Sequence, residues 1–190
     1  MKFLIISGNP KKDGLTCAVT AEIERGAKDG GADVEIISCE KIPRCHVCGD
    51  GWGTCRNENT CAFGKDGFNE LQEKIKNADL LCFISPVYWG EASESLKAFM
   101  DRLRRCEFTA FGSGDGVLKG KQTLLAAVPG GSGNGLLTCL QQTERFCQHT
   151  GAVIFDYIGV NRWNQNYKKT AAYNAALLMA KGIKNGETIS

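Results

Sequence analysis

Four cysteines in one polar loop are the first residues of this chain that could do chemistry. The loop Glu40–Lys65 carries Cys45, Cys48, Cys55 and Cys61, which are separated by two, six and five residues. Thiolates are the preferred ligands of zinc and of iron–sulfur clusters, and four thiols this close together can reach one tetrahedral or cubane site. Three readings follow: a 4Fe–4S cluster, a zinc ion, or free thiols, two of which could form a redox-active pair.

A second candidate site is the loop Ser7–Thr16, which joins an apolar run to an amphipathic segment. Backbone amides of a glycine-containing loop, followed by a helix N-terminus, bind anions such as phosphate. The loop is neither a Gly-x-Gly-x-x-Gly nor a Gly-Lys-Ser/Thr motif. The alternative is an ordinary strand-to-helix turn. The loop's side chains suited to holding an anion are Ser7, Asn9, Lys11, Lys12 and Thr16.

Two further segments follow predicted buried strands. The turn Ser85–Gly90 contains Pro86 and the adjacent aromatic pair Tyr88 and Trp89, and the glycine-rich segment 129–135 follows a later strand. In an open α/β sheet, ligands bind outside the carboxyl ends of the strands, which is where both segments are expected. Glycines allow close approach of the backbone, although they could also only loosen a connection. The aromatic pair could alternatively be a surface or subunit contact.

The elements that must position these residues alternate between strand and helix along the whole chain. Five strands and five helices imply a single α/β domain, residues 1–190, with a parallel sheet covered on both faces. The expected strands are Lys2–Ser7, Asp33–Ser38, Leu80–Ser85, Gln122–Val128 and Ala152–Ile158. The expected helices are Leu15–Lys28, Phe68–Asn77, Glu91–Cys106, residues 135 to about 149, and Gln165–Lys181. The alternation alone allows either a flavodoxin-like or a dinucleotide-binding strand order.

Composition excludes several classes of function. The formal net charge is +2 over 190 residues, and no block of Lys and Arg stands out, so we expect no nucleic-acid partner. No apolar run is long enough to span a membrane, and the N-terminal apolar stretch is too short for a signal peptide. We therefore expect a cytoplasmic protein with no membrane partner. Ten cysteines in such a chain are not expected to form a disulfide framework.

Two of these segments resemble a known family. Residues 85–102 resemble the "PVYWG…LKAFMDR" signature of the flavodoxin-like NAD(P)H-dependent FMN reductases, and the Ser7–Thr16 loop resembles their "GSPRKNGNT" loop. Asn9 and Leu15 depart from that loop, and Leu15 could contact phosphate only through its backbone. The resemblance implies the flavodoxin strand order 2-1-3-4-5. It implies an FMN phosphate site at Ser7, Asn9, Lys11, Gly14, Leu15 and Thr16, and a flavin-ring site at Pro86, Val87, Tyr88, Trp89, Gly90, Gly130 and Gly131.

The resemblance also implies a function. We expect an FMN-dependent NAD(P)H oxidoreductase in which the flavin, rather than a catalytic side chain, passes electrons to a small acceptor such as a flavin, a quinone, or an azo or nitro compound. A homodimer or homotetramer is expected. Both NADH and NADPH remain open as donor. A near-balanced charge is unlike the strongly acidic flavodoxin-type carriers.

Two other functions are alternatives to an FMN-dependent NAD(P)H oxidoreductase. Iron–sulfur flavoproteins of the same family bind a 4Fe–4S cluster through cysteines in this region, separated by two, two and then more residues. The third cysteine here, Cys55, is displaced by four positions from that pattern. The other alternative is a non-enzymatic flavin-binding or subunit-interaction module. Asp101 and Arg102 on the third predicted helix are expected to form a structural or subunit-contact pair.

Overall fold

The computed structural model describes residues 1–114 and 116–182; the predicted domain 1–190 therefore includes residue 115 and residues 183–190, which lie outside the described part. The strands are β1 (Lys2–Ser7), β2 (Asp33–Ser38), β3 (Leu80–Tyr88), β4 (Glu91–Ala92), β5 (Gln122–Pro129) and β6 (Val153–Gly159). The helices are α1 (Gly14–Asp29), α2 (Phe68–Asn77), α3 (Glu94–Ser113), α4 (Leu136–Thr150) and α5 (Gln165–Ala180). Three short 3₁₀ turns, at 39–41, 54–56 and 64–66, lie between β2 and α2.

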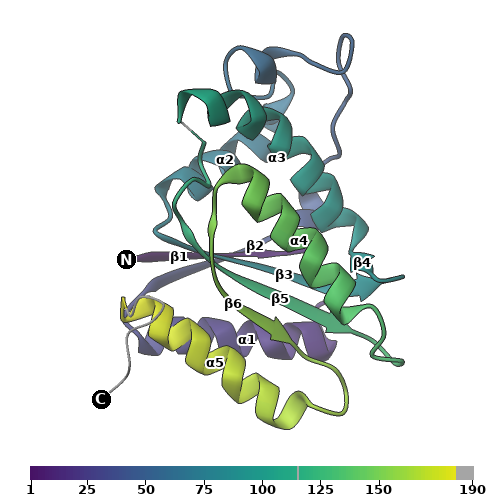
Figure 1. The fold of residues 1–190 in the computed structure, drawn as a ribbon, viewed down its shortest axis with the longest axis vertical. Coiled ribbons are helices and arrows are strands. Elements are labelled where there is room, and N and C mark those ends of the chain that lie inside the picture. The colour runs from purple at the N-terminus through teal and green to yellow at the C-terminus, as the bar shows by residue number, and fades with distance from the viewer. Residues whose placement is uncertain (115, 183–190) are drawn as a thin grey trace.

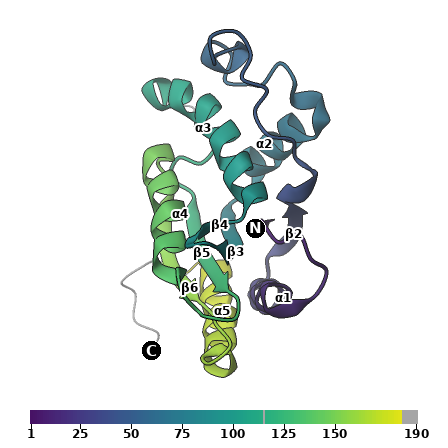
Figure 2. The ribbon, with the colours of Figure 1, turned by 90° about the vertical axis from the view of Figure 1, so that its right-hand side faces the viewer.

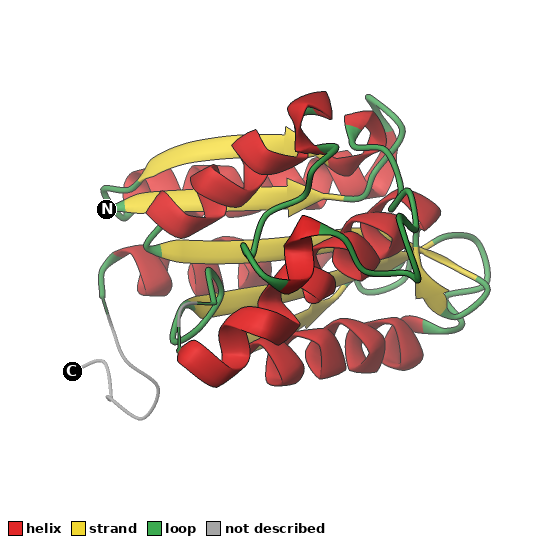
Figure 3. Ribbon diagram, turned by 90° about the horizontal axis from the view of Figure 1, so that it is seen from above, coloured by secondary structure: helices red, strands yellow, loops and turns green. Residues whose placement is uncertain are grey.

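The sheet has the expected flavodoxin-like order. Five strands pair in parallel in the order β2-β1-β3-β5-β6, and the two-residue β4 pairs antiparallel with the end of β3. The five long strands therefore run in the predicted order 2-1-3-4-5, and the expected fold is confirmed. Seen from above, the strand arrows point the same way, so their carboxyl ends share one edge (Figure 3).

The boundary between β3 and α3 differs from the prediction. Strand β3 continues to Tyr88 because β5 pairs with it as far as Val87, opposite Pro129. Glu91 and Ala92, predicted to open the helix, form β4 instead. Helix α3 begins at Glu94 because Ser93 caps it: the Ser93 Oγ accepts a hydrogen bond of 3.4 Å from the Leu96 amide.

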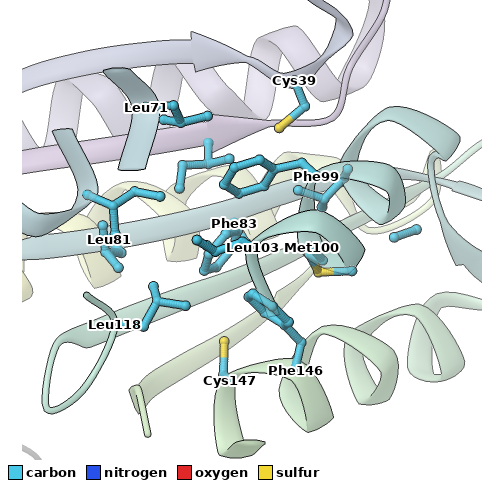
Figure 4. Packing of buried hydrophobic residues seen from close by; sticks show 14 of the residues in the cluster. Cys39, Leu71, Leu81, Phe83, Phe99, Met100, Leu103, Leu118, Phe146 and Cys147 are labelled. Atoms are coloured by element: carbon cyan, nitrogen blue, oxygen red, sulfur yellow. The ribbon is translucent and has the colours of Figure 1, made fainter. Parts of the chain in front are cut away.

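Helices cover both faces of the sheet, with α1 and α5 on one face and α2, α3 and α4 on the other (Figures 1 and 2). Two buried clusters result, one on each face. The larger includes Leu81 and Phe83 of β3, Phe99 and Met100 of α3, and Phe146 of α4 (Figure 4). The smaller packs Val19 and Ile23 of α1 and Met179 of α5 against the opposite face. Both faces of the central strands are therefore buried, as a parallel sheet requires.

Beyond residue 44, the cysteine-rich loop lies away from the shared strand edge. It runs over α2 and α3 at the top of the view in Figure 1, whereas the carboxyl ends of β3 and β5 lie at the right. Within the described residues, the structure contains no helix that is long and apolar enough to cross a membrane.

Candidate functional site

The predicted phosphate loop leads into a helix whose N-terminus is open. Asp13 is the N-cap residue of α1, yet its side chain makes no capping hydrogen bond, and the first turn holds no acidic residue. The first backbone N–H groups of a helix have no intrahelical partner, and they favour an anion. Lys11 and Lys12 are exposed beside this N-terminus. The loop therefore has the free donors and the charge that a phosphate requires.

Asn9 shapes this loop. Its Nδ2 donates to the Lys11 carbonyl at 2.9 Å and lies 3.1 Å from the Cys17 Sγ, and its Oδ1 accepts from the Lys11 amide at 3.3 Å. The Ser7 Oγ accepts a hydrogen bond of 3.2 Å from the Asn9 amide. Thr16 is buried in the first turn of α1. The side chains of Ser7 and Asn9 thus hold the backbone in its curve, which leaves direct anion binding mainly to backbone amides.

Two serines that the sequence reasoning missed tie the loop to α3. The Gly8 carbonyl accepts hydrogen bonds from Ser93 Oγ at 2.6 Å and Ser95 Oγ at 3.1 Å. The Ser93 amide donates to the Ser85 Oγ at 2.8 Å. The loop after β1 and the segment after β3 are therefore fixed to each other. A Ser-x-Ser pair at a predicted helix start was the available signal.

The hairpin between β3 and β4 forms the next part of the site. Trp89 and Gly90 have φ values of 52° and 84°, and the Trp89 side chain is fully exposed. A Cβ on Gly135 would lie 2.4 Å from the Gly90 Cα, so only glycine allows the hairpin to approach the start of α4 this closely. Thr138 of α4 donates to the Gly90 carbonyl at 2.6 Å. The hairpin is thereby held against α4.

Two hollows flank this hairpin. One, of about 560 Å³, lies between the hairpin and the glycine-rich loop after β5, and Val87, Trp89, Gly90, Gly130 and Gly131 line it together with residues 132, 134 and 135. The other, of about 370 Å³, is lined by residues of the loop after β1, the segment 39–44, Tyr88 and the start of α3.

The predicted site residues thus lie on three loops at one edge of the sheet. The loop that leads to the open α1 N-terminus shares a hollow with Tyr88 through Pro10, and a glycine-lined hollow lies beside the same β3–β4 hairpin. The first suits a phosphate, and the second admits the edge of a flat ring close to the backbone. The residues present therefore fit FMN, which carries both groups.

Arg102 organises the cysteine-rich loop. The side chain is fully buried, and its Nη1 donates to the Pro43 carbonyl and to Asp66 Oδ2, both at 2.9 Å. Its Nη2 donates to the Phe63 carbonyl at 3.2 Å and to the Cys61 Sγ at 3.3 Å. Of the expected structural or subunit-contact pair, Arg102 is structural, whereas Asp101 pairs with Lys97 and Arg104 rather than with Arg102. The loop is thus folded around a buried cation from α3.

The Arg102–Asp66 pair is reflected in the pKa of Asp66. Partial burial disfavours the Asp66 carboxylate, but the Arg102 hydrogen bond, the Phe68 amide and the Arg102 charge outweigh it. The pKa of Asp66 therefore lies below its ordinary value. The guanidinium also lies 4.3 Å from the centre of the Phe68 ring, a cation–π contact that joins α3 to the start of α2.

The four loop cysteines do not form a ready metal site. Cys55 is buried, while Cys45, Cys48 and Cys61 are half-buried. Across residues 1–114 and 116–182, no three His, Cys, Asp or Glu side chains are arranged as ligands of one ion. Binding a cluster would require the loop to draw its cysteines together, so their assignment as ligands stays a prediction.

A further thiol, Cys106 of α3, lies near this loop. Burial raises the pKa of Cys106 to about 12, and the charges of Cys55 and Cys61 add to the effect. Cys106 follows Arg102 by one helical turn, so both side chains face the loop. The sequence held no signal that the loop would lie near Cys106.

Comparison with known proteins identifies the family. Residues 1–165 match the family described as NADPH-dependent FMN reductase. The chain belongs to this family. Membership in the NADPH-dependent FMN reductases confirms the expected oxidoreductase class, with FMN as cofactor and NAD(P)H as electron donor.

Relatives agree with this membership, and solved structures agree with the fold. The chain is 29% identical over 195 residues to an iron–sulfur flavoprotein of Methanosarcina thermophila, covering 96% of this chain and 93% of the relative. It is 31% identical over 150 residues to an iron–sulfur flavoprotein of Methanocaldococcus jannaschii, covering 77% and 71%.

Among solved structures, an NADH:FMN oxidoreductase has a TM-score of 0.67 at 16% identity, covering 98% of this chain and 91% of that one. A flavone reductase has a TM-score of 0.68 at 20% identity; the match covers 96% of this chain but 62% of the longer reductase. At these identities the structures support the fold alone.

Proposed function

We propose that this FMN reductase passes electrons from NAD(P)H through FMN to a small acceptor, and that FMN lies across the β3–β4 hairpin. The observation that carries the proposal is the meeting, at one strand edge, of the open α1 N-terminus and the glycine-lined hollow. Bound FMN supplies the redox chemistry, because its ring can accept a hydride and release the electrons to a second substrate.

The protein's own part is to bind, orient and shield. Backbone amides at Gly14, Leu15 and Thr16 would hold the phosphate, and Lys11 would add charge at the same end. The backbone of the segment from Pro86 to Gly90 and the Gly130–Gly131 segment of the next loop would hold the ring. Because the hairpin is fixed by the Gly90–Gly135 approach and the Thr138 hydrogen bond, the ring meets a preformed surface.

A second candidate function has its own support. The curated relatives named above are iron–sulfur flavoproteins, and this chain has four cysteines in the loop next to α3. In that case Cys45, Cys48, Cys55 and Cys61 would hold a cluster that exchanges electrons with a protein carrier. The displaced third cysteine and the dispersed thiols count against it, so we place it second.

The assembly and the acceptor also remain predictions. We propose a homodimer or homotetramer, in keeping with an exposed Phe108 beside a hollow of about 470 Å³ between α3 and α4. The acceptor is proposed to be a flavin, a quinone, or an azo or nitro compound. The cytoplasmic location expected from the sequence is likewise a prediction.

Anaerobic purification with a visible spectrum, iron analysis and a NAD(P)H oxidation assay tests the proposal. We expect flavin absorption with about one FMN per chain and oxidation of NADH or NADPH that depends on FMN and on an added acceptor. Negligible iron would support the two-electron reductase. A broad brown shoulder with about four irons per chain would bring the second candidate to first place.

Absence of bound flavin after incubation with excess FMN would contradict the proposal. Flavin binding without NAD(P)H oxidation would instead support the non-enzymatic flavin-binding module. The double variant Asn9→Ala with Thr16→Ala tests the phosphate loop without changing the ring site. It is expected to weaken FMN binding. Unchanged FMN affinity in this variant would remove the phosphate-loop assignment.

A further inference from the structure

The loop after β6 carries two side chains, Arg162 and Trp163, that are not part of the proposed FMN site. Residues 160–164 follow the carboxyl end of β6, next to the glycine-rich loop after β5. Arg162 lies over the ring of Trp163, with its guanidinium carbon 4.3 Å from the ring centre. The two side chains therefore form one stacked pair at the same edge of the sheet as the proposed flavin site.

Side-chain amides hold this loop in a fixed shape. The Asn161 Oδ1 accepts from the amides of Trp163 at 3.0 Å and Asn164 at 3.1 Å. In return, the Asn164 Oδ1 accepts from the Asn161 amide at 2.8 Å, and its Nδ2 donates to the Gly159 carbonyl at 3.2 Å. A loop tied down in this way presents Arg162 and Trp163 at little cost in chain entropy.

Trp163 borders the glycine-rich loop directly. Gly133 has a φ of 68°, and a Cβ added to it would lie 2.5 Å from the Trp163 Cζ3. The indole thus rests against the loop whose Gly130 and Gly131 line the flavin-side hollow. Yet Trp163 as a residue remains 62% exposed, although Arg162 lies over its ring. Trp163 therefore keeps much of its surface open to a ligand.

We infer that Arg162 and Trp163 bind the adenosine-phosphate half of the nicotinamide dinucleotide. The inference rests on the proposed function, which brings the nicotinamide to the flavin. An indole face stacks with a nucleobase, and a guanidinium pairs with phosphate oxygens, so this pair matches the two chemical parts of that half. We name the pair, Arg162 with Trp163, the nucleotide shelf.

The position of the nucleotide shelf supports this ligand over a small acceptor. A donor whose nicotinamide lies at the ring must extend its other half beyond the hollow, and Trp163 adjoins that hollow through Gly133. A small quinone or nitro compound ends at the ring and has no phosphate for Arg162. The shelf therefore sets how strongly the donor binds, while the hydride transfer takes place at the flavin.

Truncation of the donor tests the inference. The FMN-loaded enzyme is assayed with NADH, with NADPH and with reduced nicotinamide mononucleotide, which lacks the adenosine-phosphate half. Trp163→Ala is expected to raise KM for both dinucleotides by about tenfold, with kcat nearly unchanged. This is the change in affinity that loss of one base–aromatic stack usually causes. KM for the mononucleotide should stay constant. Trp163→Phe should restore most of the dinucleotide affinity.

Arg162→Gln gives the complementary result. Its KM for the dinucleotides should rise and depend less on salt concentration than that of the wild type, because a phosphate contact has been lost. Tyr167→Ala is the matched control: Tyr167 is an aromatic of similar exposure (64%), and it lies on α5. This variant should keep the wild-type KM for all three donors.

Three results would overturn the inference. An equal rise in KM for the dinucleotides and the mononucleotide would mean that Trp163 acts through the glycine-rich loop. Unchanged KM values in both shelf variants would mean that the pair does not touch the donor. If the wild-type enzyme binds FMN but oxidises none of the three donors, the proposed function fails, and the inference fails with it. Turnover by the wild-type enzyme shows that the proposed function holds, so that the first two results would then count against the inference alone.

Discussion

At the scale of single residues, the most consequential side chain is Arg102. A buried guanidinium is costly unless its N–H groups find acceptors, and here Asp66, two carbonyls and the Cys61 sulfur accept from Nη1 and Nη2, while the buried Nε has no acceptor among the described residues. Three of these partners are in the cysteine-rich loop and Asp66 directly follows it, whereas Arg102 is on α3. One side chain thus fixes a loop of few regular hydrogen bonds to the domain, whether or not the loop also binds a metal.

Replacing Arg102 should therefore destabilise the protein and release the loop. We expect Arg102→Met to lower the free energy of unfolding by about 3 kcal/mol, since it leaves Asp66 without its buried partner. Urea denaturation measures this loss, and limited proteolysis should show faster cleavage within residues 40–65.

Arg104→Met is the control. Arg104 is exposed, and its Nε lies 3.6 Å from the Asp101 Oδ1 in a surface ion pair. Its expected effect is within about 0.5 kcal/mol. Similar losses in the two variants would show that the Arg102 contacts do not hold the loop.

At the scale of elements, the site depends on how the β3–β4 hairpin meets α4. Two glycines at positive φ, Gly90 and Gly135, allow their backbones to touch, and Thr138 secures the contact. The hairpin carries Tyr88 and Trp89, so its position determines where the ring surface lies. A shift of the hairpin would widen the hollow beside Val87 and Gly130.

Gly135→Ala should weaken FMN binding, and by more than the backbone strain at a positive φ would cause by itself. The new Cβ would meet the Gly90 backbone at 2.4 Å, so the hairpin must move. We expect FMN affinity to fall by about tenfold, or about 1.4 kcal/mol. Quenching of flavin fluorescence during titration measures this change.

Gly31→Ala provides the comparison, because Gly31 also has a positive φ, 88°, but an added Cβ there meets nothing within 4 Å. It should lose about 1 kcal/mol of stability through backbone strain and keep wild-type FMN affinity. Equal flavin affinity in the two variants would contradict the proposed importance of the hairpin contact.

At the scale of the whole molecule, the site exists only because parallel strands end at one edge. The loops after β1, β3 and β5 come from distant parts of the sequence, and the sheet order places them side by side. A ligand that binds all three loops binds the folded state alone. Its binding free energy therefore adds to global stability.

FMN should raise the melting temperature through this linkage. At a free concentration 100 times its Kd, FMN should add about 2.7 kcal/mol of stability, or roughly 5–10 °C for a domain of this size. Riboflavin, which lacks the phosphate, should give a clearly smaller shift at the same concentration. Differential scanning calorimetry measures both shifts, and equal shifts would show that the loop after β1 does not bind the phosphate.

Much of the architecture was predictable because it depends on local periodicity. The bounds of β1, β2 and α2 agree with the prediction to the residue, since each element is a clear apolar pattern between polar or glycine-rich turns. The start of α3 was not predictable in this way. Residues 91 and 92 have no strand signal of their own, and they form β4 only because β3 continues past Ser85.

The sequence by itself therefore determined the α/β fold, the family and the loops at which chemistry is expected, because repeating apolar patterns and short motifs act over neighbouring residues. Only the tertiary structure decided that Arg102 pairs with Asp66, that Gly90 touches Gly135 and that Trp163 rests against Gly133. Each of these contacts joins residues far apart along the chain. Their distance is set by how helices and strands pack, which no local pattern encodes.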